Sequence, residues 1–203
     1  ISNCVINLSP DKRRVFGEIF RVLRHGGELY FADIFAGRRI PEQLRAHPVL
    51  VGECLGGALY LEDFRRMLRQ LGCPDHRVVE CRAVALDDPE VKRLAGMIDF
   101  YSMTVRAFHL PELEDICEDY GQVATYLGTI PHHPHRFVLD DHHVFEAGRP
   151  LRVCGNTAMM LERTRYAPHF DIWGDRSTHY GPFRVGQRAV PSADEAPGGC
   201  GCR

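Results

Sequence analysis

The chain has 203 residues, of which 44% are hydrophobic, and its formal net charge is -2. A chain of this size buries a core without disulfide staples, so we interpret its eight cysteines as reduced thiols. The mixed charges form no basic stripe, and no apolar run approaches a membrane span, which argues against nucleic-acid and membrane partners. We therefore expect a soluble cytoplasmic protein.

The N-terminal sequence predicts a strand, a helix and a second strand. Residues 1–8 are apolar enough for a buried strand, and Ser9 and Pro10 suit the cap and the first position of a helix. Apolar residues then recur at helical spacing until the Gly26-Gly27 pair, after which residues 28–33 predict another strand. A crossover of this length makes the two strands parallel neighbours.

Such a unit is typical of an open α/β sheet, in which ligands bind at the carboxyl ends of the strands. Cys4 and Asp33 both lie near that end of their predicted strands. The chain also begins inside the first strand without a methionine, so we expect it to be a piece of a longer protein.

The remaining sequence predicts the rest of the sheet and a smaller lobe. A loop or short helical stretch at 36–48 precedes Cys54, and an amphipathic helix at 61–68 is stopped by Gly72. Further strands are expected at 77–84 and 100–108, then at 121–128, 136–140 and 144–145, with a helix at 156–161. These predictions give a sheet domain at 1–110, a small β-rich α+β domain at 111–188 and a disordered tail at 189–203.

Several segments together resemble one enzyme family. They are 2–8 (SNCVINL), 11–12 (DK), 21–23 (RVL), 26–31 (GGELYF), 52–60 (GECLGGALY) and 101–106, with the likeness covering residues 1 to about 180. They resemble the arsenite S-adenosylmethionine methyltransferases, and the two cysteine loops distinguish that family from generic methyltransferases.

The resemblance implies the C-terminal part of a Rossmann-like class I methyltransferase sheet followed by a small C-terminal domain. It implies that Cys4 and Cys54 bind trivalent arsenic, that Asn3 contacts S-adenosylmethionine, and that Glu53 orders a water or adjusts the neighbouring thiol. It places a further family cysteine and the glycine-rich loop that holds the methyl donor upstream of this chain.

The function implied by the resemblance is methylation of arsenite or its thiol conjugates by a monomer that a thiol reductant, thioredoxin or glutathione, returns to the reduced state. Thiolates suit a soft centre such as arsenic, and electropositive or helix-end surroundings would favour their ionisation. Two other functions stay open: a non-catalytic module that binds arsenite or another soft metal, and a methyltransferase of another small molecule.

The other cysteines and the histidines have simpler interpretations. Without the flanking motif, Cys4 itself would be read as a small apolar filler of a buried strand. We predict structural roles for Cys73, Cys81, Cys117 and Cys154, and a dispensable tail for Cys200 and Cys202. The histidines at 132, 133, 135, 142 and 143 could bind a metal, but a solvated or hydrogen-bonded role is favoured, because spacing alone does not make ligands converge.

Overall fold

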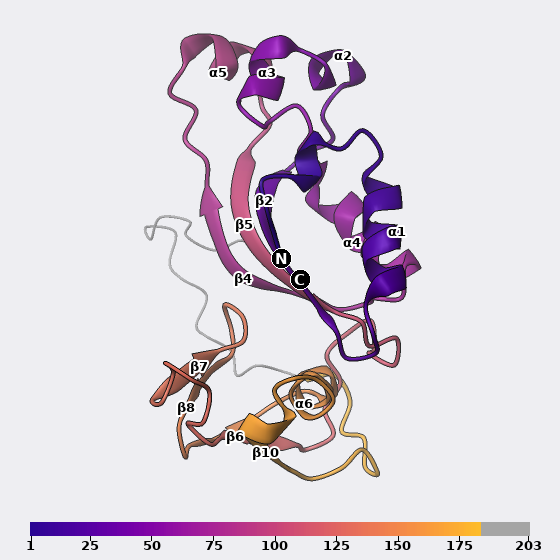
Figure 1. The fold of residues 1–203 in the computed structure, drawn as a ribbon, viewed down its shortest axis with the longest axis vertical. Helices are drawn as coiled ribbons and strands as arrows, with labels where there is room; N and C mark the ends of the chain where they lie inside the picture. The colour runs from indigo at the N-terminus through magenta and orange to yellow at the C-terminus, as the bar shows by residue number, and fades with distance from the viewer. Residues whose placement is uncertain (184–203) are drawn as a thin grey trace.

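The computed structural model describes residues 1–183. Figure 1 shows a long, curved sheet with helices at one end and on one side, and a smaller lobe below it. The elements of the sheet region are β1 (Ser2–Asn3), η1 (Ile6–Leu8), α1 (Lys12–Val22), β2 (Glu28–Ala36), α2 (Glu42–Arg45), α3 (Pro48–Gly52), β3 (Leu59–Tyr60), α4 (Leu61–Gln70), β4 (His76–Ala83), α5 (Pro89–Ala95) and β5 (Phe100–Phe108).

The strand order is β1-β2-β5-β4, with β3 also paired to β2. β1 and β2 are parallel, as the sequence predicts, and β5 runs antiparallel to both β2 and β4. β5 pairs with β2 along the whole of 28–36, so β1 and β3 must follow one another along the opposite edge of β2. The mixed α/β fold class expected from the sequence is confirmed.

Two details at the start of the chain differ from the prediction. The first strand ends at Asn3, because Cys4 takes a left-handed conformation with φ of 51° and the chain then turns into η1. The helix cap is Asp11 rather than Ser9, since the Asp11 carboxylate accepts a 2.9 Å hydrogen bond from the Arg14 N–H.

Helices α1 and α4 cover one face of the sheet (Figure 1). Their aromatic residues Phe16 and Phe64 pack edge-on against Phe31 of β2, and all three side chains are fully buried. A second cluster of buried apolar residues includes Leu50, Val91 and Phe100. It joins the short helices α3 and α5 to the end of the sheet. This cluster supports the segment that carries Cys54.

The smaller lobe has its own apolar core around Tyr126, Phe145 and Leu161. Its elements are β6 (Val123–Tyr126), β7 (Arg136–Val138), β8 (Val144–Glu146), β9 (Pro150–Arg152), α6 (Gly155–Glu162), η2 (Ala167–His169) and β10 (Phe170–Trp173). One sheet has the order β10-β6-β9 and the other is the β7-β8 hairpin. The strands and helix predicted for this lobe are present; the predicted tail at 189–203 lies outside the described residues.

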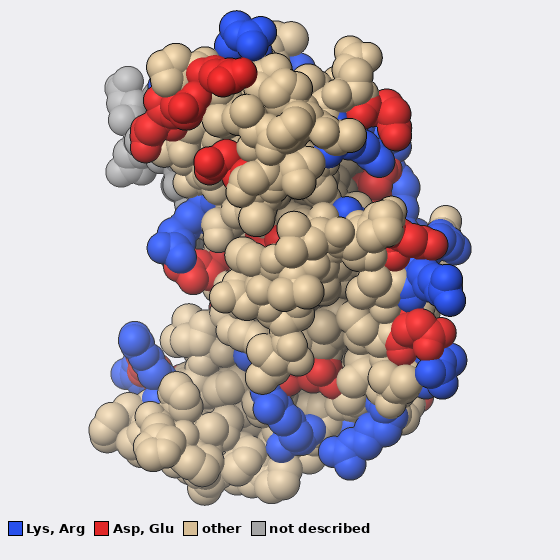
Figure 2. Space-filling model, turned by 45° about the horizontal axis from the view of Figure 1, so that its top comes forward, with Lys and Arg blue, Asp and Glu red and all other residues tan. Residues whose placement is uncertain are grey.

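On the face shown in Figure 2, acidic and basic side chains are interspersed around larger uncharged areas. Within residues 1–183, no helix is both long and apolar enough to cross a membrane.

Candidate arsenic site at the edge of the sheet

Cys4 lies directly after β1, at the carboxyl end of that strand. Its N–H donates a 2.9 Å hydrogen bond to the Ala32 carbonyl of β2, which fixes the backbone, while the residue itself is exposed. A positive φ is uncommon for a residue with a Cβ. Where the surrounding structure enforces it, the residue is a candidate for a functional role.

Cys54 has a similar left-handed backbone conformation, with φ of 59°, in the turn after α3. The turn is held by the Leu50 carbonyl, which accepts hydrogen bonds from the N–H groups of Leu55 at 2.8 Å and Gly56 at 2.9 Å. Of the non-glycine residues with a described backbone, Cys4 and Cys54 are two of the three with positive φ, and His132 is the third. Both cysteines thus lie at tight turns rather than within regular elements.

Gly57 brings the two cysteine segments together. A Cβ at this position would lie 2.0 Å from the Asn7 carbonyl oxygen, so only glycine allows this approach. Asn7 is in turn fastened to the end of β2, because its N–H donates to Asp33 at 3.0 Å and its amide donates to the Ile34 carbonyl at 2.6 Å. The second glycine of the Gly56-Gly57 pair is therefore required for steric reasons.

Cys54 is close enough to Cys4 to affect the charge of the Cys4 thiol. The pKa of Cys4 is raised, first by burial of its thiol, then by the negative charge of Asp33 and then by that of Cys54. Asp33 is itself only 2% exposed, and burial raises its own pKa against the hydrogen bonds from Ile34 and Asn7. Cys4 therefore lacks the electropositive surroundings that would favour its ionisation, since the charged groups that shift its pKa, Asp33 and Cys54, are both negative.

A cavity of about 330 Å³ opens beside Cys54. Its wall includes Asn7, Lys12, Tyr60 and Gly57, whereas Cys4 does not line it. The Lys12 ammonium donates to the carbonyls of Asn7 at 3.2 Å and Ser9 at 3.0 Å, and its pKa is lowered, chiefly by burial. This basic side chain is thus held at the wall by the same segment that carries Cys4.

The other two predicted site residues are exposed. Asn3 is the last residue of β1, paired with Ala32, and its position at the carboxyl end of the strand agrees with the expected ligand side of the sheet. Glu53 caps the C-terminus of α3 and does not line the cavity. The structure places the segments of Cys4 and Cys54 at one edge of the sheet, and the roles of all four residues stay predictions.

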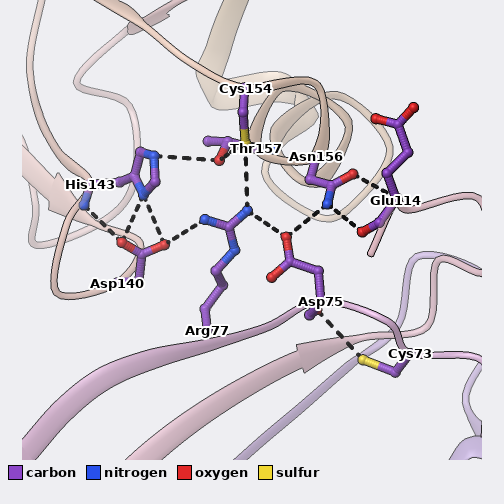
Figure 3. A network of polar contacts seen from close by, with 9 residues as sticks. All are labelled: Cys73, Asp75, Arg77, Glu114, Asp140, His143, Cys154, Asn156 and Thr157. Carbon is purple, nitrogen blue, oxygen red and sulfur yellow. Dashed lines mark hydrogen bonds and ion pairs between the residues drawn. The ribbon is translucent and has the colours of Figure 1, made fainter. Parts of the chain in front are cut away.

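The histidines do not form a metal site within the part of the chain that is described, where no group of three or more potential ligand residues converges. His143 instead bonds the Asp140 carboxylate through Nδ1 at 2.8 Å. Asp140 also pairs with the buried Arg77 at 3.2 Å, in a polar network that includes Asp75, Cys154 and Asn156 (Figure 3). Sequence reasoning missed this network, because its members come from separate elements.

Comparisons with known families agree with this fold. A family described as "Methyltransferase domain" matches residues 1–72, and a family described as "Arsenite methyltransferase C-terminal domain" matches residues 120–191. The first part of this chain is therefore similar to methyltransferase domains, and a later part is similar to the C-terminal domain of arsenite methyltransferases.

Individual relatives narrow the class. An arsenite methyltransferase of Aquipseudomonas alcaligenes is 52% identical, and the match covers 90% of this chain and 53% of the relative. An arsenite methyltransferase of Mus musculus is 40% identical, and the match covers 84% of this chain and 44% of the relative. The crystal structure of an arsenic(III) S-adenosylmethionine methyltransferase from Chlamydomonas reinhardtii superposes with a TM-score of 0.84 at 52% identity, covering 89% of this chain and 60% of that one. This chain is a homologue of the arsenite methyltransferases, and it spans about half the length of the curated relatives it matches.

Proposed function

We propose that this chain carries the arsenic-binding part of an arsenite methyltransferase, with Cys4 and Cys54 as ligands of trivalent arsenic. The observation that carries the proposal is the convergence of two cysteines in left-handed turns at one edge of the sheet, near enough for the charge of one to raise the pKa of the other. A pair of soft sulfur ligands suits a thiophilic centre. The names of the relatives suggest arsenic as the substrate. The positions of Cys4 and Cys54 support these two residues as its ligands.

Binding is an exchange of ligands on arsenic. Each cysteine forms an As–S bond and displaces a hydroxide, or a small thiol if arsenic arrives as a thiol conjugate. The raised pKa of Cys4 keeps its proton on sulfur, so this proton leaves with the displaced group as water or as a small thiol. The backbone bonds of Cys4 and Leu55 hold the turns in place while the exchange occurs.

The methyl donor we propose is S-adenosylmethionine, which supplies an electrophilic methyl group when it is bound. Among the described residues, Asn3 is available for a polar contact with S-adenosylmethionine, because its side chain is exposed at the carboxyl end of β1. This chain contributes orientation rather than acid-base chemistry, since the arsenic lone pair needs no deprotonation before it reacts. Glu53 could order a water nearby from its exposed position beside Cys54.

The remaining parts of the proposal come from the sequence and from family likeness. They are a thiol reductant of the thioredoxin or glutathione kind, a cytoplasmic location and a monomer. Cys4, Cys54, Cys73, Cys117 and Cys154 are free thiols, which is consistent with a reducing environment.

The test uses a chimera in which this chain replaces the matching part of the Chlamydomonas relative. Incubated with arsenite, S-adenosylmethionine and glutathione, the chimera should form methylated arsenic, measured by arsenic speciation. Cys4→Ser and Cys54→Ser should each abolish the product, and Cys81→Ser, a half-exposed cysteine of β4, should keep it.

Three outcomes would contradict the proposal. Methylation at the parent rate by either serine variant would remove that cysteine from the site. Stoichiometric arsenite binding without consumption of S-adenosylmethionine would favour the binding module, and methylation of other nucleophiles with arsenite ignored would favour the other class of methyltransferase.

A further inference from the structure

Cys117 and Cys154 form a second pair of sulfur atoms, away from the arsenic site. Each of these thiols changes the pKa of the other, as side chains that lie next to one another do. The backbones that carry them are also joined, because the N–H of Gly155 donates a 2.9 Å hydrogen bond to the carbonyl of Glu118. This backbone hydrogen bond holds the two cysteine segments side by side.

Cys154 is the N-cap of α6, a position where an acceptor side chain is preferred. Its sulfur accepts from the Thr157 N–H at 3.5 Å and lies 3.3 Å from the Thr157 hydroxyl. The buried Arg77 guanidinium reaches it at 3.9 Å (Figure 3). A helix N-terminus, a cation and a thiol donor all favour a negative charge on this sulfur.

The pKa of Cys154 is accordingly lowered to about 5, first by the neighbouring Cys117 thiol and then, against the effect of burial, by Arg77 and Thr157. The pKa of Cys117 is raised by Cys154 and by burial. The pair therefore shares one proton. Cys73 provides the contrast, since burial raises its pKa to about 12 and its thiol only donates to the Asp75 carbonyl.

Access differs between the two sulfurs. Cys154 is 1% exposed, whereas Cys117 is partly exposed. A small reagent therefore reaches Cys117 first, and Cys154 can act on whatever becomes attached there.

We propose that Cys117 and Cys154 are a reversible dithiol–disulfide pair that exchanges with small disulfides such as oxidised glutathione. This site is independent of the proposed arsenic chemistry.

The exchange proceeds in two balanced steps. The Cys154 thiolate accepts the Cys117 proton as the Cys117 sulfur attacks the small disulfide. The S–S bond breaks to release one thiolate, which takes the proton from Cys154. The Cys154 thiolate then attacks the Cys117 sulfur and releases the second small thiolate. Two protein sulfurs are oxidised, and one small disulfide is reduced to one thiol and one thiolate.

The experiment equilibrates the full chain in glutathione buffers with graded ratios of the oxidised and reduced forms, followed by alkylation, trypsin digestion and mass spectrometry. Peptides 107–136 and 153–163 each contain one cysteine, so a link between them identifies the pair. The linked peptide should increase with the oxidised fraction and disappear in excess reduced glutathione. Cys73→Ser should give the same result as the parent chain.

Cys154→Asp tests the division of roles and keeps the fold, because aspartate is a favoured N-cap and carries a negative charge beside Arg77. Without the second sulfur, glutathione should stay attached to Cys117 in this variant, at a yield several-fold above that in the parent chain. Two results would overturn the proposal: both cysteines of the folded parent chain remaining alkylatable in fully oxidised glutathione, or equal glutathione attachment to Cys117 in the parent chain and in Cys154→Asp. Circular dichroism of each sample confirms that it is folded.

Discussion

Cys4 and Cys54 hold left-handed backbone conformations in a chain that uses glycine for most such positions. A residue with a side chain pays on the order of 1–3 kcal/mol to stay in a sparsely populated conformation, and it persists there only when its neighbours impose it. Here the Ala32 and Leu50 carbonyls impose it through backbone hydrogen bonds. Two such positions, both occupied by cysteine and both at one edge of the sheet, support a role for the sulfur atoms.

The charge of Asp33 should be measurable in the reactivity of Cys4. Burial is the largest cause of the raised pKa of Cys4, and the Asp33 carboxylate is the next. Asp33→Asn removes this charge, so the pKa of Cys4 should fall and its alkylation by iodoacetamide should reach half its maximal rate at lower pH. Peptide 1–12 contains only this cysteine, which allows the rate to be followed by mass spectrometry.

Glu53→Gln is the control for Asp33→Asn, because Glu53 is exposed and does not contribute to the pKa of Cys4. It should leave the midpoint of the alkylation profile unchanged. An identical midpoint in Asp33→Asn would show that the carboxylate does not act on this thiol.

At the scale of elements, the site depends on two short strands that share one edge of β2. β1 pairs with Phe31 and Ala32, and β3 pairs with Phe35 and Ala36. The loop after β1 and the loop before β3 must therefore pass one another, and they do so where Gly57 meets the Asn7 carbonyl. The convergence of the cysteines follows from this strand order.

Gly57→Ala should separate the two loops. The added methyl group would lie 2.0 Å from the Asn7 oxygen, which is backbone and cannot move aside alone. We expect a loss of roughly 1–3 kcal/mol in the free energy of unfolding, as for other overpacked sites, and weaker arsenite binding because the thiols no longer meet. Urea denaturation and arsenite titration measure the two effects.

Gly52→Ala is the matched control, since a Cβ on Gly52 would meet nothing within 4 Å. It should unfold and bind arsenite like the parent chain. If Gly57→Ala did the same, the close approach of the loops would not be what assembles the site.

The helices and strands of the sheet region were largely predictable, because α1, α4 and β5 have clear periodicity and turn residues at their ends. The short first strand was not, since it ends at the left-handed conformation of Cys4, which no turn residue indicates. Nor could sequence place β5 between β2 and β4, because the pairing depends on tertiary packing.

The candidate site was predictable to a similar degree. Cys4 and Cys54 stand in motifs that the family likeness identifies, and the topology of the first strands puts Cys4 at the correct end. The pair of Cys117 and Cys154 was not predictable, since both residues were interpreted as structural and their contact depends on how the segment before β6 packs against α6. The charge of Asp33 beside Cys4 was also missed, because it follows from the register of β1 on β2.

At the scale of the whole molecule, a buried polar network connects the sheet to the smaller lobe. Arg77 of β4 pairs with Asp75 at 2.8 Å and with Asp140 of the lobe at 3.2 Å, and the Asn156 amide of α6 donates to Asp75 at 2.9 Å. A backbone hydrogen bond from Asp141 to the Val78 carbonyl reinforces the same junction. Breaking one buried partner leaves a charge without compensation, which costs more than the pair itself contributes.

Asp140→Asn should therefore destabilise the protein by roughly 3–5 kcal/mol at neutral pH, because Arg77 and His143 lose their shared carboxylate.

Burial alone would raise the pKa of Asp140, but His143 and Arg77 hold it well below its ordinary value. A carboxyl group with a lowered pKa in the folded state stabilises the fold above its unfolded pKa of about 4, and this contribution is lost as the pH falls below that value. The difference in unfolding free energy between Asp140→Asn and the parent chain should accordingly shrink in acid, as urea denaturation at pH 7 and at successively lower pH would measure. Asp141→Asn is the control, since the Asp141 side chain is partly exposed and, within residues 1–183, forms an ion pair only with His142, at 3.6 Å. An equal loss in both variants would mean that the junction does not depend on the buried pair.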